Sequence, residues 1–416
     1  MTMSWRPILE GEAAAQAIRV AGEIAHELVA ACTPVGPPDP REAIVDRGDA
    51  GLALACAYLY RAGLLDSGDA AGELLDRALV AVAEHEMDHT LLRGFTGIGW
   101  VANHIIGDPE DDPVEAIDEA LLALLVEGPP LHFDLIQGLV GIGTYALARM
   151  PRASAHRILE LVVGRLARAA EHTAAGITWF TSPDAPGGDP IAYPRGSYAL
   201  GFARGVPGVT ALVAAAHRHG IAGATELVDG SVAWLLAQQI DTPAARFPIQ
   251  IVAGSPPITA RPAWCFGDIG VALGLAIAAG ARDRADWRQI AIETARLSAT
   301  SPLGDHEIHD AGICHGSAGL AHLVNRIYQL TGDGELRRGA VRWYERALAM
   351  RRPADGYAGF APAVAPGVLD ASGRAGWSLV FGAAGVSLCL LSAATSLEPA
   401  WDQLLLVDMI AVGEFG

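Results

Sequence analysis

The motif Gly-x-x-Gly followed by an apolar run recurs seven times along the chain, at intervals of 44 to 67 residues. A single copy carries no information, but seven copies that open similar segments indicate one repeated supersecondary unit. The runs after the glycines, such as 52–60 and 140–149, are apolar on nearly every side, which is typical of buried helices. The seven copies begin at Gly48, Gly94, Gly138, Gly205, Gly267, Gly316 and Gly382.

Segments with one charged and one apolar face lie between the buried runs and predict an outer layer of helices. They cover residues 10–32, 72–86, 113–127, 154–172, 223–239, 285–299 and 334–351. We therefore expect an all-α fold, an α/α toroid of seven inner and seven outer helices, formed by residues 1–416 as a single domain. The glycines would lie at the mouth of the ring, where the inner helices begin. The best strand candidate is 247–252, which Pro248 weakens.

Composition excludes several classes of partner and compartment. The net charge is −18, from 29 basic and 47 acidic residues, which argues against nucleic acid as a partner. Five cysteines, an odd number in a large chain, argue against a disulfide framework and for a reducing cytoplasm. Residues 1–11 lack the apolar core of a signal peptide. Residues 375–397 are uncharged and long enough to span a bilayer, but Gly382 and Gly385 favour a buried helix start.

Two connections are too long and too rich in proline for simple linkers. Residues 176–196 contain four prolines together with Trp179, Phe180 and Tyr193, and residues 241–262 contain five prolines. Long loops without structure of their own are usually functional or disordered. The aromatic residues among the prolines favour a lid or a wall of a substrate site over a plain linker.

Two cysteines and a histidine stand directly before two of the repeated motifs. Cys265 is followed by Phe-Gly, and Cys314 and His315 directly precede Gly316. Three sulfur or nitrogen ligands with a fourth position open is the stoichiometry of a catalytic zinc site. Consecutive helical residues point about 100° apart, so Cys314 and His315 can share a metal only from a turn. The alternatives are a closed zinc site or three unrelated polar residues.

The remaining cysteines and a second group of ligands have simpler interpretations. Cys32, Cys56 and Cys389 lie within helical runs and are interpreted as core residues. Residues 305–310 read Asp-His-Glu-Ile-His-Asp and could chelate a second metal. The glycines on either side favour a solvated loop there.

With seven helix pairs, Trp264-Cys265-Phe266-Gly267 and Cys314-His315-Gly316, the chain resembles the lanthionine synthetase C-like family of lanthipeptide cyclases over residues 47–386. The resemblance implies a cytoplasmic toroid with Zn²⁺ bound by the two cysteines and the histidine. It also implies thioether formation, in which a peptide cysteine adds to dehydroalanine or dehydrobutyrine. The partners would be a dehydrated precursor peptide, a separate dehydratase, and a membrane reached only peripherally through an export complex.

Two further residues match active-site positions of that family. Arg261 matches an active-site arginine and would steady the enolate oxygen or a peptide carbonyl; otherwise it is a surface arginine. Asp134 matches an acid that faces the mouth and would orient a protonated group or pair with Arg261. Asp134 could also cap the third inner helix, and the two roles are compatible.

Two positions depart from the family pattern. The fourth repeat usually has a histidine before its glycine, the presumed general acid, and this chain has Arg204; Phe266 replaces a frequent tyrosine. Arg204 could bind an enolate oxygen, but it is a poor proton donor. The proton could come from water or from His132. His217 and His219 would lie roughly 20 Å down the helix, too far to replace it.

Three functions are therefore open. The first is a zinc-dependent cyclase of dehydrated peptides. The second is a non-catalytic scaffold that keeps zinc structurally within a peptide-modification complex. The third is an enzyme that adds a small thiol such as glutathione to dehydroamino acids. The intact ligand set favours an enzyme, whereas Arg204 and Phe266 favour the scaffold.

Overall fold

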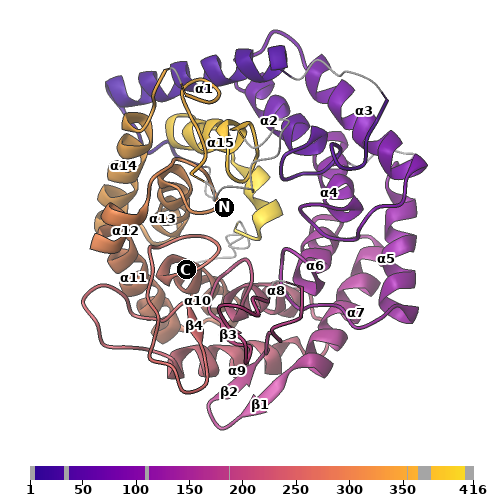
Figure 1. The fold of residues 1–416 in the computed structure, drawn as a ribbon, viewed down its shortest axis with the longest axis vertical. Coiled ribbons are helices and arrows are strands. Elements are labelled where there is room, and N and C mark those ends of the chain that lie inside the picture. The colour runs from indigo at the N-terminus through magenta and orange to yellow at the C-terminus, as the bar shows by residue number, and fades with distance from the viewer. Residues whose placement is uncertain are drawn as a thin grey trace.

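The computed structural model describes residues 5–31, 37–107, 112–186, 188–353, 355–363 and 376–407. Within these ranges it is mostly helical, with fifteen α-helices, one 3-10 helix and four very short strands. Figure 1 shows most of the helices arranged as two concentric rings. The predicted all-α toroid is thereby confirmed, whereas its assignment to residues 1–416 as one domain stays a prediction.

The inner ring consists of the seven helices that follow the repeated glycines. Each inner helix contacts the next, and the last contacts the first, so the ring is closed (Figure 1). Its members are α2 (Asp49–Arg61), α4 (Phe95–Ile106), α6 (Leu139–Ala148), α8 (Val206–Arg218), α10 (Asp268–Arg282), α13 (Ser317–Thr331) and α15 (Ala383–Ala394). Their residues are buried almost without interruption, as apolar faces on all sides require.

The outer ring covers the inner one with amphipathic helices. Its members are α1 (Gly11–Ala31), α3 (Asp69–Glu84), α5 (Glu115–Glu127), α7 (Ala153–Ala169), α9 (Ala224–Ala237), α11 (Ala285–Thr300) and α14 (Gly334–Ala349). Six of them pack on the inner helix that precedes them in the chain, while α1 packs on α15 and completes the seventh pair. Trp5 Nε1 strengthens that last pairing by donating to the Ser392 carbonyl at 2.7 Å.

The repeated glycines are explained by close packing at the mouth of the ring. The first glycine of each motif is the N-cap of its inner helix. In every repeat except the fifth, the second glycine has no room for a side chain, because the preceding segment folds back over the first helical turn; at Gly270 the nearest atoms belong to Phe202 of the neighbouring turn. A Cβ at Gly97 would lie 1.7 Å from the Leu91 carbonyl oxygen, and one at Gly51 would lie 1.9 Å from that of Val45. The motif is therefore a packing requirement of each helix start.

The turns before the inner helices are joined to one another by backbone hydrogen bonds. The N–H of Trp264 donates to Cys314 O at 3.0 Å, and the N–H of Cys314 donates to Val380 O at 3.0 Å. The series continues from Leu379 to Asp46 at 2.9 Å and from Asp46 to Leu92 at 2.9 Å. These bonds fix the relative positions of side chains that are far apart in the sequence.

Short strands tie together the two proline-rich connections. Strand β1 (Glu171–Thr173) pairs antiparallel with β2 (Gly176–Thr178), and β3 (Tyr198–Ala199) pairs antiparallel with β4 (Gln250–Ile251). The strand predicted at 247–252 is reduced to β4, and the outer helix predicted at 154–172 ends at Ala169. Since β3 follows the first connection and β4 lies inside the second, the pairing brings both to one side of the mouth.

The 3-10 helix η2 (Ala400–Leu405), drawn in yellow, lies inside the ring (Figure 1). It contacts α4 and α6, and its Asp402 is fully buried against His322 and Arg326 of α13. Trp401 Nε1 donates to Ser392 Oγ near the C-terminal end of α15, at 3.3 Å. Because these partners lie away from the helix starts, η2 fills the ring at the end opposite the mouth.

The cysteines interpreted as core residues and the uncharged segment can also be placed. Cys56 in α2 and Cys389 in α15 are buried and free, whereas Cys32 lies outside the described residues. The described part of the uncharged segment contains α15 as a buried helix; its residue 375 is not described. Among the described helices, none combines the length and the apolar character that crossing a membrane would need.

Candidate functional site

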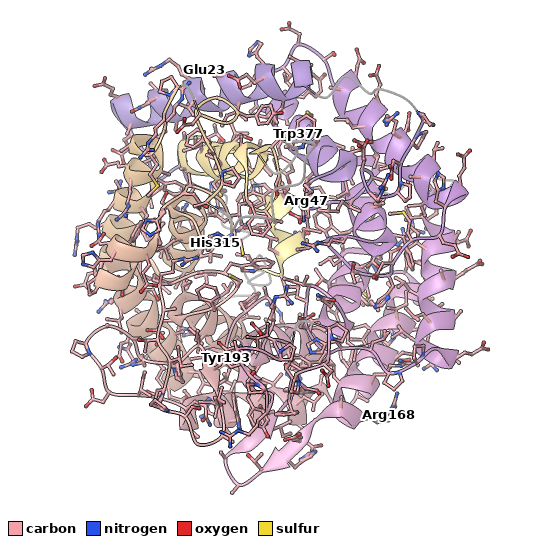
Figure 2. The ribbon with its side chains drawn as sticks, viewed as in Figure 1. Glu23, Arg47, Arg168, Tyr193, His315 and Trp377 are labelled. Atoms are coloured by element: carbon pink, nitrogen blue, oxygen red, sulfur yellow. The ribbon has the colours of Figure 1, made fainter. Side chains whose placement is uncertain are left out.

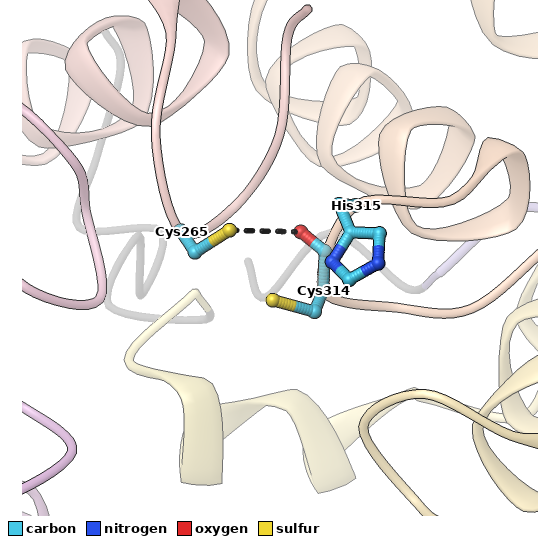
Figure 3. A group of neighbouring side chains, drawn as sticks. All are labelled: Cys265, Cys314 and His315. Atoms are coloured by element: carbon cyan, nitrogen blue, oxygen red, sulfur yellow. Dashed lines mark hydrogen bonds between the residues drawn. The ribbon is translucent and has the colours of Figure 1, made fainter. Parts of the chain in front are cut away.

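Cys265, Cys314 and His315 come together at the mouth of the ring. Cys265 lies on the turn before α10, and the other two lie on the turn before α13 (Figure 3). Their ligand atoms all lie within 4.8 Å of one another, and Cys265 Sγ is 3.9 Å from the Cys314 carbonyl oxygen. In the part of the chain that the structure describes, no other group of three histidine, cysteine or acidic side chains is assembled in this way.

The geometry of this group fits zinc. Zinc binds cysteine sulfur at about 2.3 Å and histidine nitrogen at about 2.0–2.1 Å, so tetrahedral ligand atoms lie roughly 3.3–3.8 Å apart. The observed upper limit of 4.8 Å needs shifts of about 1 Å or less to reach that geometry. Cys314 is buried, whereas Cys265 and His315 are only partly so, which leaves an approach for a fourth ligand.

The contact between the two thiols shifts their pKa values in opposite directions. A hydrogen bond with Cys314 lowers the pKa of Cys265 below its ordinary value, and the same contact raises the pKa of Cys314. Burial alone would lower the pKa of His315, but the Cys265 thiolate and the Asp310 carboxylate raise it. A lowered pKa at Cys265 beside the Asp310 carboxylate suits a site that binds a cation.

Asp310 supports the histidine from behind. Its Oδ2 lies 3.7 Å from His315 Nε2, and backbone N–H groups of Gly312 and Ala363 hold the carboxylate at 3.1 and 2.8 Å. A carboxylate on one ring nitrogen commonly orients the other toward a metal. Sequence reasoning placed Asp310 only within the alternative cluster 305–310. The sequence signal that could have identified Asp310 is its position five residues before His315, ahead of the same helix.

That alternative cluster does not form a loop throughout. Residues 302–307 form the short helix α12 (Pro302–Glu307), so the solvated loop expected there was wrong for its first half. His309 is exposed, whereas Asp310 is buried. Among the described residues, the members of 305–310 do not assemble into a second site.

Arg261 lies beside the candidate metal group. Its guanidinium carbon is 5.4 Å from the centre of the Phe266 ring, and its backbone N–H donates to Glu307 at 2.9 Å. Its positive charge acts on both Cys265 and His315. Phe266 stands where the family frequently has a tyrosine. It therefore provides an aromatic face for Arg261 but no hydroxyl.

Asp134 and Arg204 form a second polar group on the neighbouring turns. Asp134 Oδ2 is 3.8 Å from Arg204 Nη1 and 3.5 Å from His132 Nδ1. Its Oδ1 accepts the N–H of Gln137 at 2.6 Å, which braces the turn before α6, while Gly138 is the N-cap itself. Asp134 is thus placed beside Arg204, and the positive charge of Arg204 also reaches the Cys314 thiol.

Sequence reasoning missed a pattern of arginines at equivalent turns. The residue directly before the first glycine is arginine in the first, second and fourth repeats: Arg47, Arg93 and Arg204. Arg47 Nε and Arg93 Nη2 each lie 3.6 Å from the buried Asp46 carboxylate. Figure 2 shows Arg47 and His315 both close to the centre of the ring. The mouth therefore also carries arginine side chains on turns that do not supply the candidate metal ligands.

Comparisons with known proteins agree with this architecture. The profile of the family described as lanthionine synthetase C-like protein matches residues 39–406. Among solved structures, nisin cyclase matches with a TM-score of 0.76 and 18% identity, over 95% of this chain and 99% of that one. At that identity the match shows a shared fold. No curated protein sequence matches the chain.

Proposed function

Because the chain belongs to the lanthionine synthetase C-like family, we propose that it is a zinc-dependent lanthipeptide cyclase. The observation that carries the proposal is the group of Cys265, Cys314 and His315, assembled from two turns with a partly open side. A closed four-ligand site would speak for a purely structural metal. The fold shared with nisin cyclase supports the same reaction class.

The proposed reaction needs no co-reactant. The thiol of a peptide cysteine adds to the β-carbon of dehydroalanine or dehydrobutyrine, a carbon–sulfur bond forms, and the carbon–carbon double bond is lost. The thiol proton is balanced by a proton that arrives at the α-carbon. Zinc held by the three ligands would present an open position to the incoming thiol and lower its pKa.

The arginines are suited to the negative charge that builds on the peptide carbonyl oxygen. Arg261 lies beside the metal group, and Arg204 lies on the adjoining turn. Either guanidinium can donate hydrogen bonds to that oxygen, an arrangement that stabilises developing enolate charge. Neither can give up a proton at neutral pH, so these residues hold charge and do not protonate the α-carbon.

The proton donor is therefore water or His132. The N–H of Asp134 faces His132 Nδ1 at 3.3 Å, which leaves Nε2 as the ring nitrogen from which a protonated His132 could deliver a proton. His132 lies in the same polar group as Arg204, which occupies the family's usual histidine position. This placement supports His132 as the donor in a chain that lacks that histidine.

The partners follow from the reaction. The substrate would be a dehydrated precursor peptide delivered by a dehydratase in the cytoplasm, with a membrane reached through an export complex. The arginine in place of the histidine favours a second candidate, a zinc-containing scaffold without cyclase activity. A third candidate, addition of glutathione, uses the same metal group.

A synthetic peptide with one dehydroalanine and one cysteine distinguishes these functions. The zinc-loaded chain should consume the free thiol faster than the spontaneous reaction, with no change in peptide mass, as counted by alkylation and mass spectrometry. Cys314→Ala should lose both stoichiometric zinc and the acceleration, whereas Cys56→Ala, at a buried cysteine away from the mouth, should keep both. Zinc binding without acceleration would support the scaffold, and a glutathione adduct would support the third candidate.

A further inference from the structure

A small cavity lies between the turns before α6 and α8 and the two proline-rich connections. Its volume is about 50 Å³, and its lining includes Asp134, Thr181, Arg204 and Gln250. Since one water needs roughly 10–15 Å³ of such volume, the cavity holds about three to five waters or one amide group. The cavity therefore has the size of a subsite and not of a whole substrate pocket.

The cavity gathers buried polar atoms that lack hydrogen-bond partners within the described part of the chain. They are His132 Nε2, Asp134 Oδ2, Thr181 Oγ1, Arg204 Nη1 and Gln250 Oε1. Buried polar side chains are normally hydrogen-bonded, and each exception calls for an explanation. Five such atoms that come from four segments of the chain and line one cavity indicate a ligand that would complete their bonds.

The chemistry of these atoms defines the ligand. Arg204 Nη1 and His132 Nε2 are donors, Asp134 Oδ2 and Gln250 Oε1 are acceptors, and the Thr181 hydroxyl is both. The charges of Asp134 and Arg204 lie 3.8 Å apart and partly offset each other, so a group that faces both side chains meets little net charge. A neutral group with both a donor and an acceptor fits, and an amide is such a group.

The walls of the cavity are formed before any ligand arrives. Thr181 and Ser197 exchange backbone hydrogen bonds at 2.9 and 3.0 Å, which closes the first connection on itself. Gln250 lies on β4, whose pairing with β3 holds the second connection against the first. A preformed polar wall loses little conformational freedom on binding.

The cavity adjoins the candidate metal group. Arg204 belongs to the cavity lining and also acts electrostatically on the Cys314 thiol. The two turns touch, because a Cβ at Gly201 would lie 1.9 Å from the Cys265 carbonyl oxygen. We propose that this cavity is a subsite that binds one backbone amide of the substrate peptide next to the reacting residue. The proposal rests on the proposed cyclase function.

The test uses N-acetylglycine methylamide as the amide probe, with the full chain and binding followed by ligand-observed NMR. Thr181→Val and Gln250→Met each remove one unpartnered oxygen and should weaken probe binding about fivefold, on the order of one hydrogen bond. Thr181→Val should also raise the melting temperature, because it removes a buried hydroxyl without a partner. Thr178→Val is the matched control, since its buried hydroxyl also lacks a partner but does not line the cavity. It should raise the melting temperature and leave probe binding unchanged.

Kinetics with the dehydroalanine peptide separate this proposal from the proposed function. Thr181→Val should raise the KM of cyclisation more than it lowers kcat, because the lost bond holds the substrate and not the reacting atoms. Equal probe binding by wild type, Thr181→Val and Gln250→Met would overturn the subsite and leave a cavity for water alone. Weakened probe binding in a chain that shows no cyclisation would support the subsite and reject the cyclase.

Discussion

Replacing Asp402 by asparagine tests whether the buried ion pair of η2 holds the ring together. Asp402 accepts from Arg326 Nε at 2.6 Å and Nη2 at 2.9 Å, and it lies 2.6 Å from His322 Nε2. Burial would raise the pKa of Asp402, but Arg326 and His322 outweigh burial and lower it, so the carboxylate is ionised at neutral pH. Asp402→Asn keeps the size of the side chain and removes its charge.

The expected loss of stability in Asp402→Asn depends on the partners that Arg326 retains. Removing one partner of a buried ion pair costs about 3–5 kcal/mol, because the other charge stays buried. Arg326 retains Glu398 at 3.2 Å and the Pro399 carbonyl at 3.2 Å, so we expect the lower end, about 3 kcal/mol. For 416 residues the entropy of unfolding is roughly 0.9 kcal/mol per kelvin, so the melting temperature should fall by roughly 3–4 °C.

Thermal unfolding followed by circular dichroism, with urea unfolding beside it, measures this loss. The control is Asp286→Asn, at an ion pair with Arg284 on the outer surface. Exposed pairs contribute little, so that variant should unfold with the wild type. The reasoning fails if Asp402→Asn unfolds at the wild-type temperature, or if Asp286→Asn loses as much stability as Asp402→Asn.

Three further predictions concern the metal group, the pH dependence and the repeated glycines. Asp310→Asn should weaken zinc binding about 10–100-fold in competition with a chelator, because it removes the carboxylate behind His315; unchanged affinity would reject that role. Burial raises the pKa of Asp268 from 3.8 to about 6, so the folded chain binds an extra proton between these values. The free energy of unfolding, measured relative to Asp268→Asn, should therefore fall as the pH rises from about 4 to 6. Gly97→Ala should lower the free energy of unfolding by more than about 3 kcal/mol, since its Cβ would meet a carbonyl oxygen. Gly72→Ala, in open space on α3, should raise the free energy of unfolding by about 0.5–1 kcal/mol.

The inner helices were predictable because their signal is local. Each begins at a glycine that is both a cap and a point of close packing, so the motif and the helix start coincide. The pairing of α1 with α15 was not predictable, because it depends on closure of the whole ring. Strands of two or three residues, such as β3 and β4, are too short to repeat an alternating sequence pattern, and proline limited the one that was expected.

The candidate site was likewise predictable from the sequence only in part. Cys314 and His315 are adjacent in the sequence, and the motif they share with Cys265 indicated a common position at the mouth. The contact between Asp134 and Arg204 joins turns that are 70 residues apart, and no local pattern reports which turns are neighbours. The support of His315 by Asp310 and the unpartnered atoms of Thr181 likewise became visible only in three dimensions.

The backbone hydrogen bonds that join the turns at the mouth have a consequence for synthesis on the ribosome. The turn that carries Cys314 is anchored by Val380, and the turn beside it reaches Asp46 through Leu379, so both anchors are translated after the metal ligands. A nascent chain that already displays both cysteines still lacks the segment that locks their turns in place. The candidate metal ligands would therefore reach their final positions only after residues 379 and 380 have been synthesised, which on the proposed function would delay cyclisation until the seventh repeat is in place.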